Sequence, residues 1–159
     1  MNKQERTVLI AAMLMMLFCF IASINGDAAA NKMMAQKVIE DIKAAHPDLA
    51  SVELNAVRSE KEGCATIAAT ESKEIGEKCD TEDLLVLKTN QTFVEREKDC
   101  FDLTVPLLDS SGKVMATVGL DFKSRKGQNK SAVRTQGERI ASELRKKFKS
   151  REQLFESVE

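Results

Sequence analysis

Few side chains in this 159-residue sequence belong to the types that carry out chemistry. There is one histidine, His46, and beyond the apolar N-terminal stretch there are three cysteines, Cys64, Cys79 and Cys100. No two cysteines form a Cys-x-x-Cys pair, so the sequence does not predict a metal centre. A reactive thiol needs a positively charged setting, and the Glu and Lys residues next to Cys64 do not give a clear one.

The sequence also lacks the motifs of common enzymes. We find no paired-carboxylate motif, nucleophile elbow or phosphate-binding loop. His46 stands before Pro47 at the end of a helical pattern, where the helix dipole favours it. A catalytic His46 would need a nucleophile or carboxylate partner that the sequence does not place. We therefore predict a protein that is not an enzyme and has no cofactor.

The N-terminus has the pattern of an export signal. Basic residues precede an apolar run of eighteen residues, Thr7 to Ile24, and Ala28-Ala29-Ala30 offers a small-x-small cleavage site. We predict a signal peptide over residues 1–30, cleaved after Ala30. An uncleaved anchor is the alternative, because eighteen residues is near the lower limit for a membrane span. The remaining residues, 31–159, form one domain that is secreted or periplasmic.

The predicted export affects the expected oxidation state of the three cysteines. In an oxidising compartment two of the three would pair and one would be left over. Three unpaired thiols, or a metal site, are the alternatives that the residues alone leave open.

Charge is unevenly distributed along the domain. Residues 31–122 contain 11 basic and 18 acidic side chains, whereas residues 123–159 contain 11 basic and 5 acidic ones. This pattern predicts an acidic domain with a basic C-terminal helix. Export and the absence of Trp and Tyr argue against nucleic acid as a partner. No membrane contact is expected beyond the leader.

Two apolar runs define the centre of the fold. Phe101 to Leu108 and Val114 to Phe122 are rich in Val, Thr and Phe, and Asp109 to Lys113 between them contains turn-forming residues. This composition predicts a β-hairpin. By the same periodicity arguments we expect a helix over 31–45, strands over 49–58 and 64–70, a short helix over 81–88, a polar edge strand over 92–98, and a final helix capped by Ser131.

These elements predict an α+β domain. Its sheet has five antiparallel strands, with an N-terminal helix, a short middle helix and a C-terminal helix. Glu71 to Asp83 is polar and is expected to be a loop or a single helical turn, with Thr81-Glu82-Asp83 as the start of the middle helix. Leu154 and Phe155 are expected to pack back on the domain.

Two segments resemble the extracytoplasmic PAS-like sensor domains of the PDC or Cache type. FDLTVPLLDSSGKVMATVGLDF at 101–122 looks like the paired last strands of that family, and IAATESKEIGEKCDTED at 67–83 looks like a segment of its small secreted members. The resemblance covers about residues 31–159 and implies the strand order 2-1-5-4-3. In that fold Cys79 and Cys100 would lie at the same end of the sheet, so the resemblance implies a Cys79–Cys100 disulfide.

The resemblance also implies a pocket for a small polar metabolite between the sheet and the helix-loop region. By position, its border would be formed by Arg58, Thr66, Thr70, Asp80, Asp83, Thr104 and Asp121. The aromatic lining common in the family is missing, because the chain has no Tyr or Trp. The simpler interpretation is that the threonines favour strands, the acidic groups cap a helix and Arg58 is solvated.

Two functions follow as hypotheses. The first is an exported small-molecule binding or sensing module, which lacks a transmitter domain and acts through a partner protein. The second is a structural or interaction protein of the cell envelope that has no ligand and docks through its basic C-terminal helix. In the second case Val133, Ile140, Leu144 and Phe148 should be more exposed than an ordinary core stripe.

Overall fold

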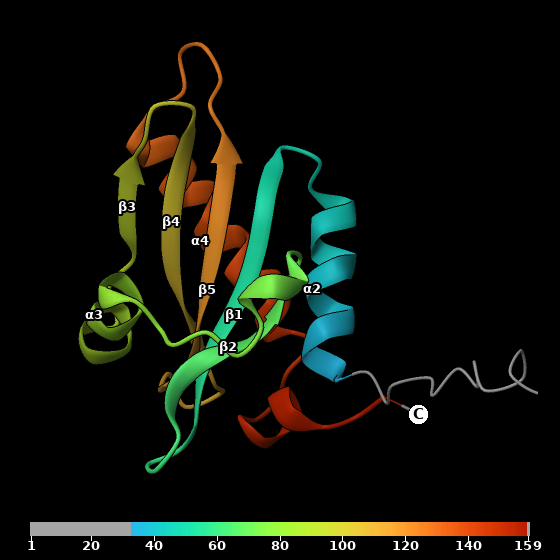
Figure 1. Cartoon of the computed structure of the whole chain (residues 1–159). Coiled ribbons are helices and arrows are strands. Elements are labelled where there is room, and N and C mark those ends of the chain that lie inside the picture. Colours follow the sequence, from blue (N-terminus) through green and yellow to red (C-terminus); the bar gives the residue numbers. More distant parts are fainter. Residues whose placement is uncertain (1–32, 159) are drawn as a thin grey trace, which may run out of the picture. The chain divides into compact units, whose positions relative to one another are not determined.

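The computed structural model describes residues 33–158 (Figure 1). The predicted signal peptide and its cleavage site lie outside the described residues. The elements are α2 (Met34–Ala45), β1 (Leu49–Ser59), β2 (Gly63–Ala69), η1 (Ser72–Glu74), α3 (Thr81–Thr89), β3 (Phe93–Arg96), β4 (Cys100–Leu108), β5 (Val114–Lys123), α4 (Lys130–Arg145) and η2 (Glu152–Phe155). Within residues 33–158, no helix has the length and hydropathy needed to cross a membrane.

The five strands form one antiparallel sheet in the order β2-β1-β5-β4-β3. The expected α+β class, the three helices and this strand order are therefore confirmed. The turn between β4 and β5 is the predicted one: Asp109 accepts hydrogen bonds from the backbone N–H groups of Ser111 and Lys113, and Gly112 adopts a positive φ. Such a turn fixes the register of the central hairpin.

One face of the sheet is apolar and is covered by α2 and α4, of which α4 runs behind the strands in Figure 1. Alternate residues of the central strands supply this face, as expected for a sheet buried on one side. Gly137 lets α4 approach closely, because a Cβ atom there would collide with the Leu103 side chain of β4. The largest fully buried side chains are Phe101, Phe122, Phe148, Ile39, Leu49, Leu54, Leu103, Leu107, Leu120, Ile140, Leu144 and Leu154.

The apolar stripe of the C-terminal helix belongs to this core. Val133, Ile140 and Leu144 of α4 are fully buried, and so is Phe148, which was expected on this helix but follows its end at Arg145. The exposure expected for docking through this stripe is therefore not observed. The helix also begins earlier than predicted, because Asn129 and not Ser131 is the N-cap, and its side chain accepts from the N–H of Ala132 at 3.0 Å.

The two ends of the domain meet. The backbone N–H of Met34 donates to the carbonyl of Glu156 at 2.8 Å, and Met33 forms a β-bridge with Ser157. Leu154 is buried and Phe155 packs against the core, which confirms that the tail returns to the domain. The end of α2 also agrees with expectation, since His46 is its C-cap and its Nε2 lies 3.0 Å from Glu143 Oε2 on α4.

Candidate functional site

The second face of the sheet is polar, and α3 and the segment before it lie on this face. Alternation along the strands places Ser51, Glu53 and Asn55 of β1 on it, and register pairing places Asp121 opposite Ser51 and Asp102 opposite Asp121. Acidic side chains directly opposite each other on neighbouring strands repel and destabilise a sheet. The Asp102–Asp121 pair therefore does not stabilise the fold, and a role in binding would be one reason for its presence.

A cavity of about 130 Å³ opens on this polar face. Strands β1, β4 and β5 form its floor, and Glu74 of η1 and Asp80, the N-cap of α3, form part of its wall. Its lining residues are Ser51, Glu53, Glu74, Asp80, Asp102, Thr104, Gly119, Leu120 and Asp121. We call this cavity the acidic pocket, because five of these residues are carboxylic acids and no described residue that lines it is basic.

Glycine at position 119 gives Glu53 its place in the pocket. A Cβ atom at Gly119 would lie 2.5 Å from Cγ and 2.6 Å from Oε1 of Glu53, so the Glu53 side chain lies across β5 in the space that a larger residue would fill. Its Oε1 accepts a hydrogen bond from Asn55 Nδ2 at 2.9 Å. Partial burial, the largest cause, raises the pKa of Glu53 to about 7.

Other carboxyl groups in the pocket are shifted in the same direction. Burial, followed by the charge of Asp121, raises the pKa of Asp102 to about 6. Burial and the charge of Glu71 raise the pKa of Glu74. Asp121 accepts a hydrogen bond from Ser51 Oγ at 2.5 Å. The raised pKa values of Glu53, Glu74 and Asp102 show that negative charge in the pocket is unfavourable, so a positive charge placed among these acids would stabilise them.

Beside the pocket, Glu53 leads into a buried polar network. Asn55 Nδ2 contacts both carboxylate oxygens of Asp83 at 3.0 Å, and Thr117 Oγ1 donates to Asp83 Oδ1 at 2.6 Å. Asp83, Asn55 and Thr117 are buried, and burial raises the pKa of Asp83. Asn55 Oδ1 has no partner among the described residues. The network ties α3 to β1 and β5 and holds the amide that contacts Glu53.

Residues 70–80, which we call the strap, close one side of the pocket. Gly76 has φ +92° and turns the strap back along β2: its N–H donates to the Thr66 carbonyl at 2.9 Å, and the Thr66 N–H donates to the Glu77 carbonyl at 2.9 Å. This return places Cys79 beside Cys64, with the two Cα atoms 5.4 Å apart and a disulfide between the sulfurs.

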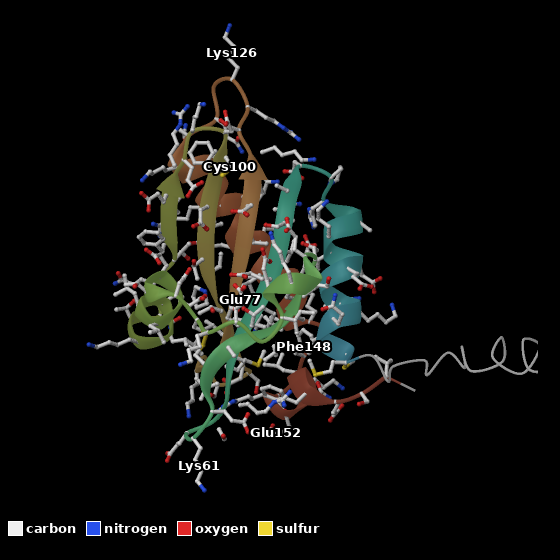
Figure 2. All side chains as sticks on the ribbon, viewed as in Figure 1. Lys61, Glu77, Cys100, Lys126, Phe148 and Glu152 are labelled. Carbon is white, nitrogen blue, oxygen red and sulfur yellow. A yellow bond between two sulfur atoms is a disulfide. The ribbon has the colours of Figure 1, made fainter. Side chains whose placement is uncertain are left out.

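The expected Cys79–Cys100 disulfide is therefore wrong. That pairing assumed that the chain continues away from β2 toward the end of the sheet where β4 begins. Instead the strap runs back antiparallel to β2, and Figure 2 shows Cys100 at the end of the sheet away from Lys61, which marks the β1–β2 turn near Cys64. Cys100 is a free thiol, and burial together with a hydrogen bond to Glu97 raises its pKa to about 11, which keeps the thiol protonated near neutral pH.

The structure brings some of the predicted pocket residues together and separates others. Asp80, Thr104 and Asp121 line the acidic pocket, and Asp83 lies in the adjoining network. Thr66 is buried in β2, and Thr70 Oγ1 accepts from the Val52 N–H at 3.0 Å.

Arg58 lies elsewhere. Its guanidinium is 5.3 Å from the centroid of the Phe155 ring, in a separate surface hollow with Arg151. It does not line the acidic pocket.

Sequence reasoning missed Glu53, Glu74, Asp102, Ser51 and Gly119. A signal for the strand residues was present, because polar side chains recur at every second position in strands that are otherwise apolar: Ser51, Glu53 and Asn55 in one, Asp102 and Thr104 in another. Within residues 33–158 no group of three or more Cys, His, Asp or Glu side chains is arranged to hold a metal ion. The pocket acids thus surround a cavity without converging on one point.

Comparison with known proteins gives a fold and no family. No family model matches the sequence, and no curated protein matches it. Among solved structures, the chain is similar to the GAF domain of an Acinetobacter phosphoenolpyruvate-protein phosphotransferase, with 13% identity and a TM-score of 0.50 over 92% of this chain and 93% of that one.

Two further structures are similar. The repressor BlcR of Agobacterium tumefaciens has 12% identity and a TM-score of 0.52 over 87% of this chain and 73% of that chain. A type II free methionine-R-sulfoxide reductase from Thermoplasma acidophilum has 15% identity and a TM-score of 0.47 over 77% and 93%. At these identities the likeness concerns the fold alone. The domain has a PAS/GAF-like fold.

Proposed function

We propose that this protein is an exported small-molecule binding module of the PDC or Cache type, and that it binds a small organic cation in the acidic pocket. The observation that carries the proposal is the pocket itself: five acids, with Asp102 directly opposite Asp121, around a cavity whose described lining contains no base. An ammonium or guanidinium group would offset their repulsion and donate hydrogen bonds to several carboxylates at once.

The fold supports a regulatory role over a catalytic one. A GAF domain and a repressor share it at low identity, and we propose that the module reports ligand binding to a partner protein. The middle helix offers a contact surface, because Leu84 and Leu85 are 52% and 46% exposed on the helix whose N-cap, Asp80, lines the pocket. The Cys64–Cys79 disulfide is compatible with an oxidising compartment outside the cytoplasm.

Calorimetric titration of the purified protein tests the ligand class. Methylammonium, ethylammonium and guanidinium chlorides are titrated at pH 8 and low salt. Methanol and ethanol serve as neutral analogues of the two alkylammonium ions, and acetate serves as an anion. We expect the cations to bind and the neutral and anionic analogues not to bind. Equal binding of the alcohols, or binding of none of the cations, would contradict the proposal.

Variants locate the binding site. Asp102→Asn should weaken binding of the best cation at least tenfold, since one carboxylate opposite another is lost from the pocket. Glu95→Gln is the matched control, because Glu95 pairs with Asp102 in register on β3, is exposed and does not line the pocket. If both variants weaken binding equally, the ligand is held by general surface charge.

A further inference from the structure

The strap is attached to the rest of the domain by few contacts. Thr70 at its start is hydrogen-bonded to Val52, and Asp80 at its end caps α3. Between these ends, three backbone hydrogen bonds and the Cys64–Cys79 disulfide join it to β2.

The side chains of the strap contribute little to its attachment. Most residues between Glu71 and Lys78 are exposed, and Ile75, the one large apolar residue there, is 43% exposed. The Lys73–Glu71 ion pair is internal to the strap. A segment with exposed backbone hydrogen bonds and no buried apolar side chain has low local stability. The disulfide at Cys79, near the C-terminal end of the strap, is the covalent restraint that holds the strap against β2, and the backbone hydrogen bonds of Gly76 and Glu77 to Thr66 are the contacts that it supports.

The same segment forms a wall of the acidic pocket. Glu74 and Asp80 both belong to the strap and line the pocket. Cys64 and Cys79 are only partly buried, so a thiol reagent can reach them, and neither belongs to the apolar core formed by α2, α4 and the sheet. Figure 2 shows Glu77 of the strap in front of the sheet, whereas the core helix α4 lies behind it.

We propose that the Cys64–Cys79 disulfide is a redox latch: its reduction by a dithiol frees the strap from β2 and opens the acidic pocket while the sheet and its helices stay folded. A thiolate of the reductant attacks one sulfur of the Cys64–Cys79 bond, which gives a mixed disulfide and releases the other cysteine as a thiol. The second thiol of the reductant then attacks the mixed disulfide and releases the first cysteine. Two electrons and two protons pass to the protein, which gains two thiols, and the reductant becomes a disulfide. The further claim that ligand affinity depends on whether this disulfide is oxidised or reduced rests on the proposed function.

Hydrogen exchange tests the latch without any ligand. The full domain carrying Cys100→Ser, so that only one cysteine pair responds, is compared before and after reduction with dithiothreitol in native buffer. We expect exchange of the Thr66 and Gly76 amides, which donate across the β2–strap contact, to speed up at least tenfold. Amides of β4, β5 and α4 should keep their protection.

Two outcomes would overturn the latch. If the strap amides keep their protection after reduction, the hydrogen bonds alone hold the strap. If the amides of β4, β5 and α4 lose protection together with those of the strap, the disulfide is a staple of the whole fold. A Cys64→Ser/Cys79→Ser variant on the same background serves as control, because its exchange should match that of the reduced protein and should not respond to dithiothreitol.

Ligand binding provides the second measurement. In the oxidised protein, the cation found by calorimetry should bind at least tenfold more tightly than in the reduced protein. If exchange shows the latch but no cation binds either form, the proposed ligand class fails and the latch stands. If a cation binds both forms equally, the link between latch and pocket is wrong.

Discussion

At the scale of single residues, the pocket combines one small residue with several acids. Gly119 leaves the space in which Glu53 lies, and Asp102 and Asp121 face each other across two strands. Asp80, Thr104 and Asp121, which the family resemblance implied for a pocket border, line the acidic pocket. The sequence did not reveal Glu53 or Asp102. Side chains along a strand alternate between the two faces of the sheet, and the face that borders a pocket is decided by what packs on it, which is not a local property of the chain.

Glu53 makes a prediction about pH. Its pKa is raised to about 7 in the folded protein, so the folded state holds a proton that the unfolded chain releases at lower pH, and the free energy of unfolding falls as pH rises between about 4.5 and 7. Glu53→Gln removes this loss. We expect the variant to be more stable than the parent at pH 8 by on the order of 1 kcal/mol, with the difference vanishing near pH 4.5.

Urea unfolding at the two pH values measures the effect. Glu60→Gln, an exposed residue of the β1–β2 hairpin, is the control and should not change the pH dependence. If the stability difference between Glu53→Gln and the parent is the same at both pH values, the charged form of Glu53 is not destabilised by burial.

The same carboxyl groups give the proposed cation binding an expected dependence on pH. Glu53 and Asp102, with pKa values raised to about 7 and about 6, carry more negative charge at pH 8 than at pH 5. We expect the affinity for the bound ammonium or guanidinium ion to rise at least tenfold between these pH values in calorimetric titrations. Affinity that is constant across this range would place the binding site outside the acidic pocket.

At the scale of elements, local patterns predicted most helices and strands, and long-range contacts decided the rest. Asn90 ends α3 in the left-handed conformation, and the period-2 pattern of β4 and β5 marks the central hairpin. The segment that contains the strap was expected to be a loop or a single helical turn, and the structure has one short helical turn there, η1. Its return along β2 is set by Gly76 and by pairing with Thr66, and no periodicity in a polar segment predicts such a contact.

The packing of α4 on β4 gives a prediction for this scale. Alanine is a better helix former than glycine by about 1 kcal/mol, yet Gly137→Ala should destabilise the protein by about 1–3 kcal/mol because its methyl group would meet Leu103. In a Leu103→Ala background the same change should be neutral or stabilising, since the space has been opened. Chemical denaturation of the four proteins gives the coupling energy, and additive effects would contradict the close approach.

At the scale of the whole molecule, one sheet separates two environments. Its apolar face packs the helices α2 and α4, and its polar face holds the acidic pocket under the strap and α3. The fold class could be predicted because composition and periodicity marked five strands and three helices, and the strand order because the family resemblance implied it. The cysteine pairing could not, because it depends on the path of the strap and not on the order of the strands.

Peptide mapping checks the disulfide in the intact protein. Trypsin separates the three cysteines, because Lys61, Lys73, Lys78, Lys88, Lys98 and Lys113 lie between and around them. Without reductant, the peptide 62–73 should be recovered joined to 79–88, and Cys100 should be alkylated on its own peptide. A cross-linked peptide that contains Cys100 would contradict the structure.

The joined ends of the domain have a consequence for engineering. Because Met34 is hydrogen-bonded to Glu156, the first and last residues of the domain lie next to each other. Residues 33–158 can therefore be inserted as a cassette into a surface loop of a reporter enzyme with short linkers. In such a chimera, comparison of the reporter's activity with and without ligand would show whether changes at the pocket reach the two neighbouring peptide junctions.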